Sequence, residues 1–168
     1  MMTPELLQKR LSHNVYGYVH IPDEWYLSYI NWWKNRHSFT IKKEWLTFCN
    51  GIIPALSSII KTLTKKGDKV LIQTPVYNHF FNSIQNNART VYESKLIYKD
   101  GVYEIDFGDL EDKLSDPETS LMILCNPHNP IGKLWTVETL SRIGELAQRH
   151  NVTVLSDEIH CDLTEPGH

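Results

Sequence analysis

The apolar and polar positions of this chain switch repeatedly between a helical period and short apolar runs. From Gly51 onward, the pattern predicts strands at residues 70–73, 90–93, 121–124 and 152–155. It predicts helices at about residues 53–66, 77–86, 109–114 and 136–150, and a turn at Asp100-Gly101. Strands that alternate with helices need crossover connections, which join parallel strands. The pattern therefore predicts an α/β fold with three α/β/α layers and a mostly parallel sheet.

Two further helices are predicted before Gly51. Thr3-Pro4-Glu5 is typical of a helix start, with an N-cap, a first-turn proline and a first-turn acid, and this helix should run to about Leu11. The second helix should begin near Pro22-Asp23. It carries aromatic residues at helical spacing: Trp25, Tyr29, Trp32 and Trp33. Such a stripe more often packs in a core or a subunit interface than binds a cofactor, so we interpret it as packing.

The composition is that of a globular domain rather than a disordered or fibrous protein. The chain has 168 residues, of which 41% are hydrophobic and 22% charged, with 8 Gly and 8 Pro. Its formal net charge of −3 provides no overall positive field, which argues against a nucleic-acid partner.

The cysteines and the N-terminus favour a soluble cytoplasmic protein. Cys49, Cys125 and Cys161 are an odd number without a disulfide framework, which is typical of a reducing compartment. The N-terminal residues lack the apolar segment of a signal peptide. No stretch approaches the roughly 20 apolar residues of a membrane span, so no membrane partner is expected.

Polar clusters follow three of the predicted strands. They lie at residues 74–77, 125–130 and 156–160, and a fourth cluster, Asn50 to Ile53, precedes a helix whose first amides are suited to hold an anion. Ligands of open α/β sheets bind outside the carboxyl ends of the strands. The clusters should therefore surround one ligand site.

The segment LMILCNPHNPIGK, residues 121–133, ends an apolar strand with two Asn-Pro pairs. Each proline requires an extended or turned backbone, so the strand stops and Asn129 is presented on a rigid loop at the edge of the sheet. Taken singly, an Asn-Pro turn, a loop acid such as Asp157 and a half-buried Tyr77 are ordinary structural features. Their expected convergence favours a binding site.

Other chemistries are weakly supported. Several metal-binding residue types are present, namely His79, His128, His160, Cys125 and Cys161, but no pair has zinc-type spacing. In an extended segment, the consecutive His160, Cys161 and Asp162 would point alternately to opposite sides. We therefore expect no metal site. No Ser-His-Asp elbow, P-loop or GxGxxG motif is present.

Three motifs carry a resemblance to a known family. Asn129-Pro130-Ile131-Gly132, Ser156-Asp157-Glu158-Ile159-His160 and Thr74-Pro75-Val76-Tyr77 resemble those of fold-type I pyridoxal-phosphate enzymes, the aspartate aminotransferase superfamily. NPHNPIGK with SDEIHCD, together with VYGY at 15–18, is most similar to the cystathionine β-lyase branch of the MalY/PatB type. The resemblance spans essentially the whole chain. It implies pyridoxal 5′-phosphate as the cofactor and a place within the large cofactor-binding domain.

The resemblance implies three contacts to the cofactor ring. Asp157 would pair with the pyridine nitrogen, Asn129 would donate to the 3′-oxygen, and Tyr77 would stack on the ring. Independent chemistry supports the first role, because the ring withdraws electrons best when its nitrogen is protonated beside a buried carboxylate. Such a charge-assisted hydrogen bond is roughly twice as strong as a neutral one.

The resemblance also implies contacts at the phosphate. The amides of Ile52 and Ile53 would bind it, and Tyr18 would reach the phosphate of a neighbouring subunit, which implies a homodimer. His160 stands where many aminotransferases of the superfamily carry a tyrosine. That departure favours the lyase branch.

One family residue has no counterpart in this sequence. The Schiff-base lysine of the superfamily lies well beyond the position of Asp157, and Lys133 is the last lysine here. We therefore expect residues 1–168 to be a single partial domain that lacks the family's N-terminal segment, its lysine region and its C-terminal small domain, and to be inactive alone.

The implied parent function is β-elimination from a sulfur amino acid such as cystathionine, which gives a thiol, pyruvate and ammonia. A class I/II aminotransferase shares every residue named above and is the alternative within the same chemistry. A non-catalytic alternative is a lysine-less pyridoxal-phosphate-binding or regulatory protein.

Overall fold

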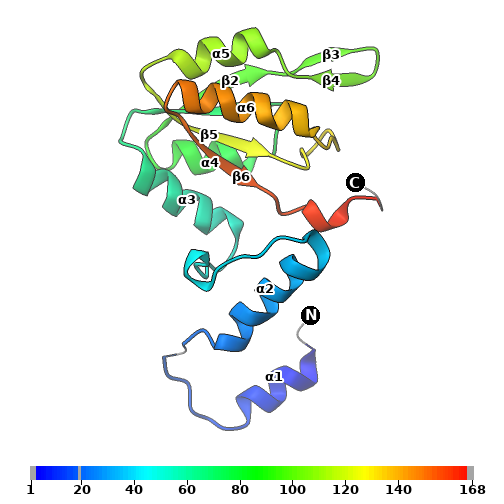
Figure 1. The fold of residues 1–168 in the computed structure, drawn as a ribbon. Coiled ribbons are helices and arrows are strands. Elements are labelled where there is room, and N and C mark those ends of the chain that lie inside the picture. The colour runs from blue at the N-terminus through cyan, green and yellow to red at the C-terminus, as the bar shows by residue number, and fades with distance from the viewer. Residues whose placement is uncertain (1–2, 19, 166–168) are drawn as a thin grey trace. The chain divides into compact units, whose positions relative to one another are not determined.

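The computed structural model describes residues 3–18 and 20–165, and these form two compact units (Figure 1). The N-terminal unit comprises residues 1–48 and the core unit residues 49–168. The prediction of a single partial domain over residues 1–168 stays a prediction.

The N-terminal unit contains the two predicted helices. Helix α1 spans Pro4–Leu11, and the Thr3 hydroxyl accepts a hydrogen bond from the Leu6 amide at 3.4 Å, as expected of an N-cap. Helix α2 spans Asp23–His37, and a short 3-10 helix, η1, spans Lys43–Trp45. Both predicted helix starts are confirmed.

The aromatic stripe of α2 packs on itself rather than in a buried core. The rings of Trp25 and Tyr29 stack with centroids 5.9 Å apart, and Phe48 lies edge-on to Trp25 at 5.5 Å. Trp32 is 51% exposed, and none of the described residues of α2 is buried. The stripe therefore does not lie in a buried core of this chain, and its packing in a subunit interface stays a prediction.

The core unit is built on a parallel sheet. Four strands run in the spatial order β2-β1-β5-β6, and every neighbouring pair is parallel. These strands are β1 Lys69–Thr74, β2 Thr90–Lys95, β5 Thr119–Cys125 and β6 Thr153–Asp157. The helices between and around them are α3 Ile52–Leu63, α4 His79–Gln85, α5 Phe107–Ser115 and α6 Val137–Arg149. The predicted mostly parallel sheet is confirmed. Among the described residues, no helix combines the length and apolar character that crossing a membrane requires.

Alternate residues of each central strand face two separate hydrophobic cores. Val70 and Ile72 of β1 pack in one core with Leu56 of α3 and Phe80 of α4. The intervening Leu71 belongs to a second core, which also contains side chains of α5 and α6. Because side chains of a strand point alternately to opposite faces, one strand supplies both cores. This arrangement gives the predicted three α/β/α layers (Figure 1).

Helix α3 ends three residues earlier than predicted. Its last residue is Leu63, and the backbone of Thr64 is extended, with φ −132° and ψ 164°. The Thr64 hydroxyl donates to the carbonyl of Ile60, which satisfies an acceptor of the last helical turn. The polar residues that follow were therefore wrongly assigned to the helix.

A hairpin surrounds the predicted Asp100-Gly101 turn. Strands β3, Ile97–Lys99, and β4, Val102–Glu104, pair antiparallel. Both turn residues have positive φ, 51° for Asp100 and 81° for Gly101, as in the two-residue turns that match strand twist. The turn was predicted but its strands were not, because strands of three residues carry too short an alternation to identify.

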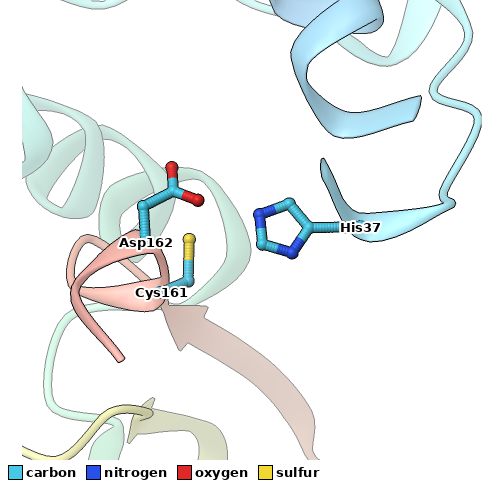
Figure 2. A group of neighbouring side chains, drawn as sticks. All are labelled: His37, Cys161 and Asp162. Atoms are coloured by element: carbon cyan, nitrogen blue, oxygen red, sulfur yellow. The ribbon is translucent and has the colours of Figure 1, made fainter. Parts of the chain in front are cut away.

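A 3-10 helix follows the last strand. This helix, η2, spans Cys161–Leu163, and Figure 2 shows Cys161 and Asp162 as neighbours on it. His37, also drawn in Figure 2, belongs to the N-terminal unit. The assumption of an extended segment at residues 160–162 was wrong, and the absence of a metal site stays a prediction.

Candidate functional site

The carboxyl ends of β1, β5 and β6 and the start of α3 surround a cavity of about 270 Å³. Its lining residues are Ile52, Ile53, Tyr77, Cys125, Asn129, Asp157, Ile159 and His160. The structure thus brings together six of the seven residues that the sequence assigns to the site. The seventh, Tyr18, lies in the N-terminal unit and is fully exposed.

Asp157 is a buried carboxylate at the end of β6. It is 7% exposed, and its Oδ1 accepts a hydrogen bond from the Ile159 amide at 3.2 Å. Its backbone carbonyl accepts from the Asn126 amide at 3.0 Å, which continues the pairing of β6 with the loop after β5. Within the described part of the chain, no Lys or Arg forms an ion pair with Asp157. A buried carboxylate without a cation is costly, so the cavity suits a ligand that brings a positively charged N–H group.

Asn129 stands on a loop that is fixed by its own hydrogen bonds. The Asn129 amide donates to Sγ of Cys125 at 3.4 Å. The His128 amide donates to the Lys133 carbonyl at 2.7 Å, and the Gly132 amide donates to the His128 carbonyl at 2.8 Å. Gly132 has φ 65°, the left-handed region that glycine adopts without a steric penalty. The half-buried Asn129 is therefore held on a tight turn beside the cavity.

Tyr77 follows β1 and also lines the cavity. Its ring lies edge-on to Phe80, with centroids 5.8 Å apart and an interplanar angle of 85°. Phe80 is completely buried in the core, so its ring gives Tyr77 a fixed support. His79 contacts Tyr77 from the exposed side, with centroids 5.0 Å apart. The three bonds Thr74-Pro75, Asn126-Pro127 and Asn129-Pro130 are cis.

The first turn of α3 has free donors at the cavity. Gly51, with φ 138°, is the N-cap and supplies no side chain to accept from the first amides. The first four amides of a helix have no acceptor within the helix, and Pro54 has no N–H at all. The amides of Ile52 and Ile53 are thus the available donors beside the cavity. Together with the helix dipole, they suit an anionic group such as a phosphate.

Two titratable side chains support the Asn129 loop. Cys125 is buried, and burial raises the pKa of its thiol, so the group is neutral near pH 7. His128 is 1% exposed, and its Nε2 lies 2.9 Å from the Pro75 carbonyl. Burial lowers the pKa of His128. The sequence placed both residues in the polar cluster at 125–130 and named them as possible metal ligands, but it did not predict their support of the Asn129 loop.

We expect His128 to make folding stability depend on pH. Because its pKa is lower in the folded state, the unfolded chain takes up a proton below about pH 6.5 while the folded protein does not. The free energy of unfolding should then fall as the pH decreases below about 6.5, by at most about 1.4 kcal/mol per pH unit from this group. Urea unfolding at pH 7.5 and 5.0 should show a smaller loss in a His128→Gln variant. Equal losses in both proteins would contradict the prediction.

Comparison with known proteins identifies the family. Residues 4–167 match the family described as aminotransferase class I and II. Cystathionine beta-lyase PatB of Bacillus subtilis (strain 168) is 45% identical over 164 residues, which cover 98% of this chain and 42% of PatB. Protein MalY of Escherichia coli (strain K12) is 36% identical over 160 residues, which cover 95% of this chain and 41% of MalY. The predicted resemblance to the MalY/PatB branch is confirmed.

A solved structure agrees with these relatives. Cystalysin from Treponema denticola, whose crystal structure contains a pyridoxal 5′-phosphate cofactor, has a TM-score of 0.90 and 37% sequence identity. The similarity covers 100% of this chain and 43% of cystalysin. The chain therefore spans about two-fifths of the length of these proteins. It belongs to the aminotransferase class I and II family.

Proposed function

We propose that this chain is the cofactor-binding part of a pyridoxal-phosphate-dependent carbon–sulfur β-lyase. The reaction would release a thiol, pyruvate and ammonia from a sulfur amino acid such as cystathionine. The observation that carries the proposal is the buried carboxylate of Asp157, without a cationic partner, in one cavity with the free amides of α3. Two relatives support the same chemistry, because PatB is named a cystathionine beta-lyase and the cystalysin structure contains pyridoxal 5′-phosphate.

The residues around the cavity fit the chemical groups of the cofactor. Asp157 would hold a proton on the pyridine nitrogen, and the side-chain amide of Asn129 would donate to the 3′-oxygen. Tyr77 would stack on the ring, while the Ile52 and Ile53 amides would bind the phosphate. When bound, pyridoxal phosphate supplies an electron sink for the bond-breaking steps at the substrate Cα.

Two further residues complete the proposed site. His160 lines the cavity with Asp157 and Asn129, where it would contact the cofactor from the end of β6. Tyr18 would reach the phosphate of a second subunit, so we propose that the protein acts as a homodimer. The full exposure of Tyr18 in one chain leaves its hydroxyl accessible for such a contact.

We further propose that residues 1–168 alone have no turnover. Lys133 is the last lysine of the sequence, and its Nζ donates to the Tyr103 carbonyl at 2.6 Å. Lys133 does not line the cavity described above. A covalent lysine must be held within bonding reach of the cofactor's aldehyde carbon, because catalysis of this kind depends on fixed positioning. Lys133 does not meet that requirement.

An aminotransferase is the second candidate, because the matched family is named for that activity. It would use the same contacts of Asp157, Asn129 and Tyr77. A non-catalytic protein that binds pyridoxal phosphate would also use them, and the lack of a lysine after Lys133 favours that alternative for this stretch alone.

The two reactions differ in their need for a keto acid. We expect the protein expressed from its complete reading frame to release equal amounts of thiol and pyruvate from cystathionine without any keto acid. Chromogenic thiol detection and a coupled pyruvate assay measure both products. In the same assay, residues 1–168 alone should release neither. Activity that requires a keto acid and yields no thiol would reject the lyase proposal in favour of an aminotransferase.

A further inference from the structure

Tyr77 and Asn129 reach the cavity from two different loops. Strands β1 and β5 are neighbours in the sheet, and the last pair of residues in their register is Ile72 and Ile123. Beyond these residues, backbone pairing between the two strands no longer fixes how far one loop lies from the other. The two loops therefore need another connection if Tyr77 and Asn129 are to keep a constant spacing.

The side chain of His128 provides that connection. Its Nε2 lies 2.9 Å from the carbonyl oxygen of Pro75. Pro75 precedes Tyr77 by two residues, and His128 directly precedes Asn129. A carbonyl oxygen can only accept a hydrogen bond, so Nε2 must be the protonated nitrogen of the neutral ring. The hydrogen bond thus fixes the tautomer of His128 as well as its orientation.

The surroundings of His128 restrict its movement. The side chain is 1% exposed, and its ring lies edge-on to Trp135, with centroids 5.7 Å apart and an interplanar angle of 89°. Its backbone amide and carbonyl are both used within the turn, by Lys133 and Gly132. Displacement of either loop would therefore break a buried hydrogen bond, which water cannot readily replace.

We propose that His128 is a positioning residue that holds the Tyr77 loop and the Asn129 loop at the spacing needed to bind pyridoxal phosphate. This inference rests on the proposed function. His128 itself does not line the cavity. His128 acts through its hydrogen bond to the Pro75 carbonyl, which sets the distance between the ring of Tyr77 and the side-chain amide of Asn129.

Two amide substitutions separate this role from simple packing. In His128→Gln, the side-chain nitrogen lies at about the same distance from Cβ as Nε2 of histidine, so it can still donate to the Pro75 carbonyl. In His128→Asn, the amide is one methylene shorter and cannot reach. Both variants carry the same neutral amide and differ by one methylene, so the comparison tests whether the side chain reaches the Pro75 carbonyl.

Titration of the complete protein with pyridoxal 5′-phosphate tests the proposal. His128→Asn should bind about tenfold more weakly than the wild type, as expected for the loss of a buried hydrogen bond, and the absorption band of the bound cofactor should shift. His128→Gln should bind within about twofold of the wild type and keep its band. Lys133→Met is the matched control, because it removes a different hydrogen bond of the same loop and should leave both readings unchanged.

Equal affinities and bands in the Asn and Gln variants would overturn the proposal, whatever their thermal stabilities. Hydrogen exchange gives a second reading that needs neither cofactor nor variant. In the wild type, the Phe80 amide, which donates to the Tyr77 carbonyl, and the His128 amide, which donates to the Lys133 carbonyl, should exchange through one common opening, with the same denaturant dependence. Independent openings would overturn the inference even if His128→Asn does not fold. A coupled opening in a protein that binds no pyridoxal phosphate would instead reject only the proposed function.

Discussion

Replacement of Asp157 by asparagine should lower kcat/KM of the complete protein for the proposed sulfur amino-acid substrate by roughly 10- to 150-fold. This range corresponds to the loss of a charged hydrogen bond, worth about 1.5–3 kcal/mol. The amide oxygen of asparagine can still accept from the Ile159 amide, so the local backbone should keep its structure. A neutral amide cannot hold a proton on the pyridine nitrogen, and the cofactor would lose its electron-withdrawing form.

The neighbouring acid provides the control for this prediction. Glu158 is exposed, accepts a hydrogen bond from the Ser156 hydroxyl at 2.9 Å and does not line the cavity. Glu158→Gln removes one negative charge from the same segment and should change kcat/KM by less than about twofold. Similar losses in both variants would show that overall charge matters and not the carboxylate at the cavity. Full activity of Asp157→Asn would remove Asp157 from the proposed site.

The arrangement of the site could be predicted because local patterns indicate where each parallel strand ends. The carboxyl ends of parallel strands meet at one edge of the sheet, so motifs that directly follow β1, β5 and β6 should lie close together. The structure brings Tyr77, Asn129 and Asp157 to one cavity as expected. The two Asn-Pro pairs end the strand where the sequence predicted, because proline cannot continue the hydrogen-bond ladder. Their roles toward a cofactor stay predictions.

Contacts between distant residues could not be predicted from local patterns. The hydrogen bond from His128 to Pro75 joins residues 53 positions apart, and nothing in either segment specifies the other. The same holds for the aromatic stripe of α2, whose spacing fits burial and exposure equally well. Trp32 illustrates this, because its helical position matched a core residue although it is half exposed.

Arg89 is a second residue whose role depends on distant contacts. It lies between α4 and β2 and is 8% exposed, although arginine is rarely buried. Its Nε donates to the Thr64 hydroxyl at 2.7 Å, and its other nitrogens donate to the backbone carbonyls of Lys61, Thr64 and Asn87. The last carbonyls of a helix have no partner within the helix. Arg89 thus closes the C-terminal end of α3, which begins at the cavity with Ile52.

Replacement of Arg89 by methionine should therefore reduce the free energy of unfolding by about 3 kcal/mol or more. Methionine fills similar volume but donates no hydrogen bond, and each buried carbonyl left unpaired costs about 1–3 kcal/mol. Arg149→Met is the matched control, because Arg149 is exposed and its only ion pair within residues 3–18 and 20–165 is with Glu111 on the surface, where such a pair contributes about 0–1 kcal/mol. Urea unfolding at pH 7 measures both changes. If the two variants lose the same small amount, the carbonyls at the end of α3 are satisfied without Arg89, and its burial does not stabilise the helix.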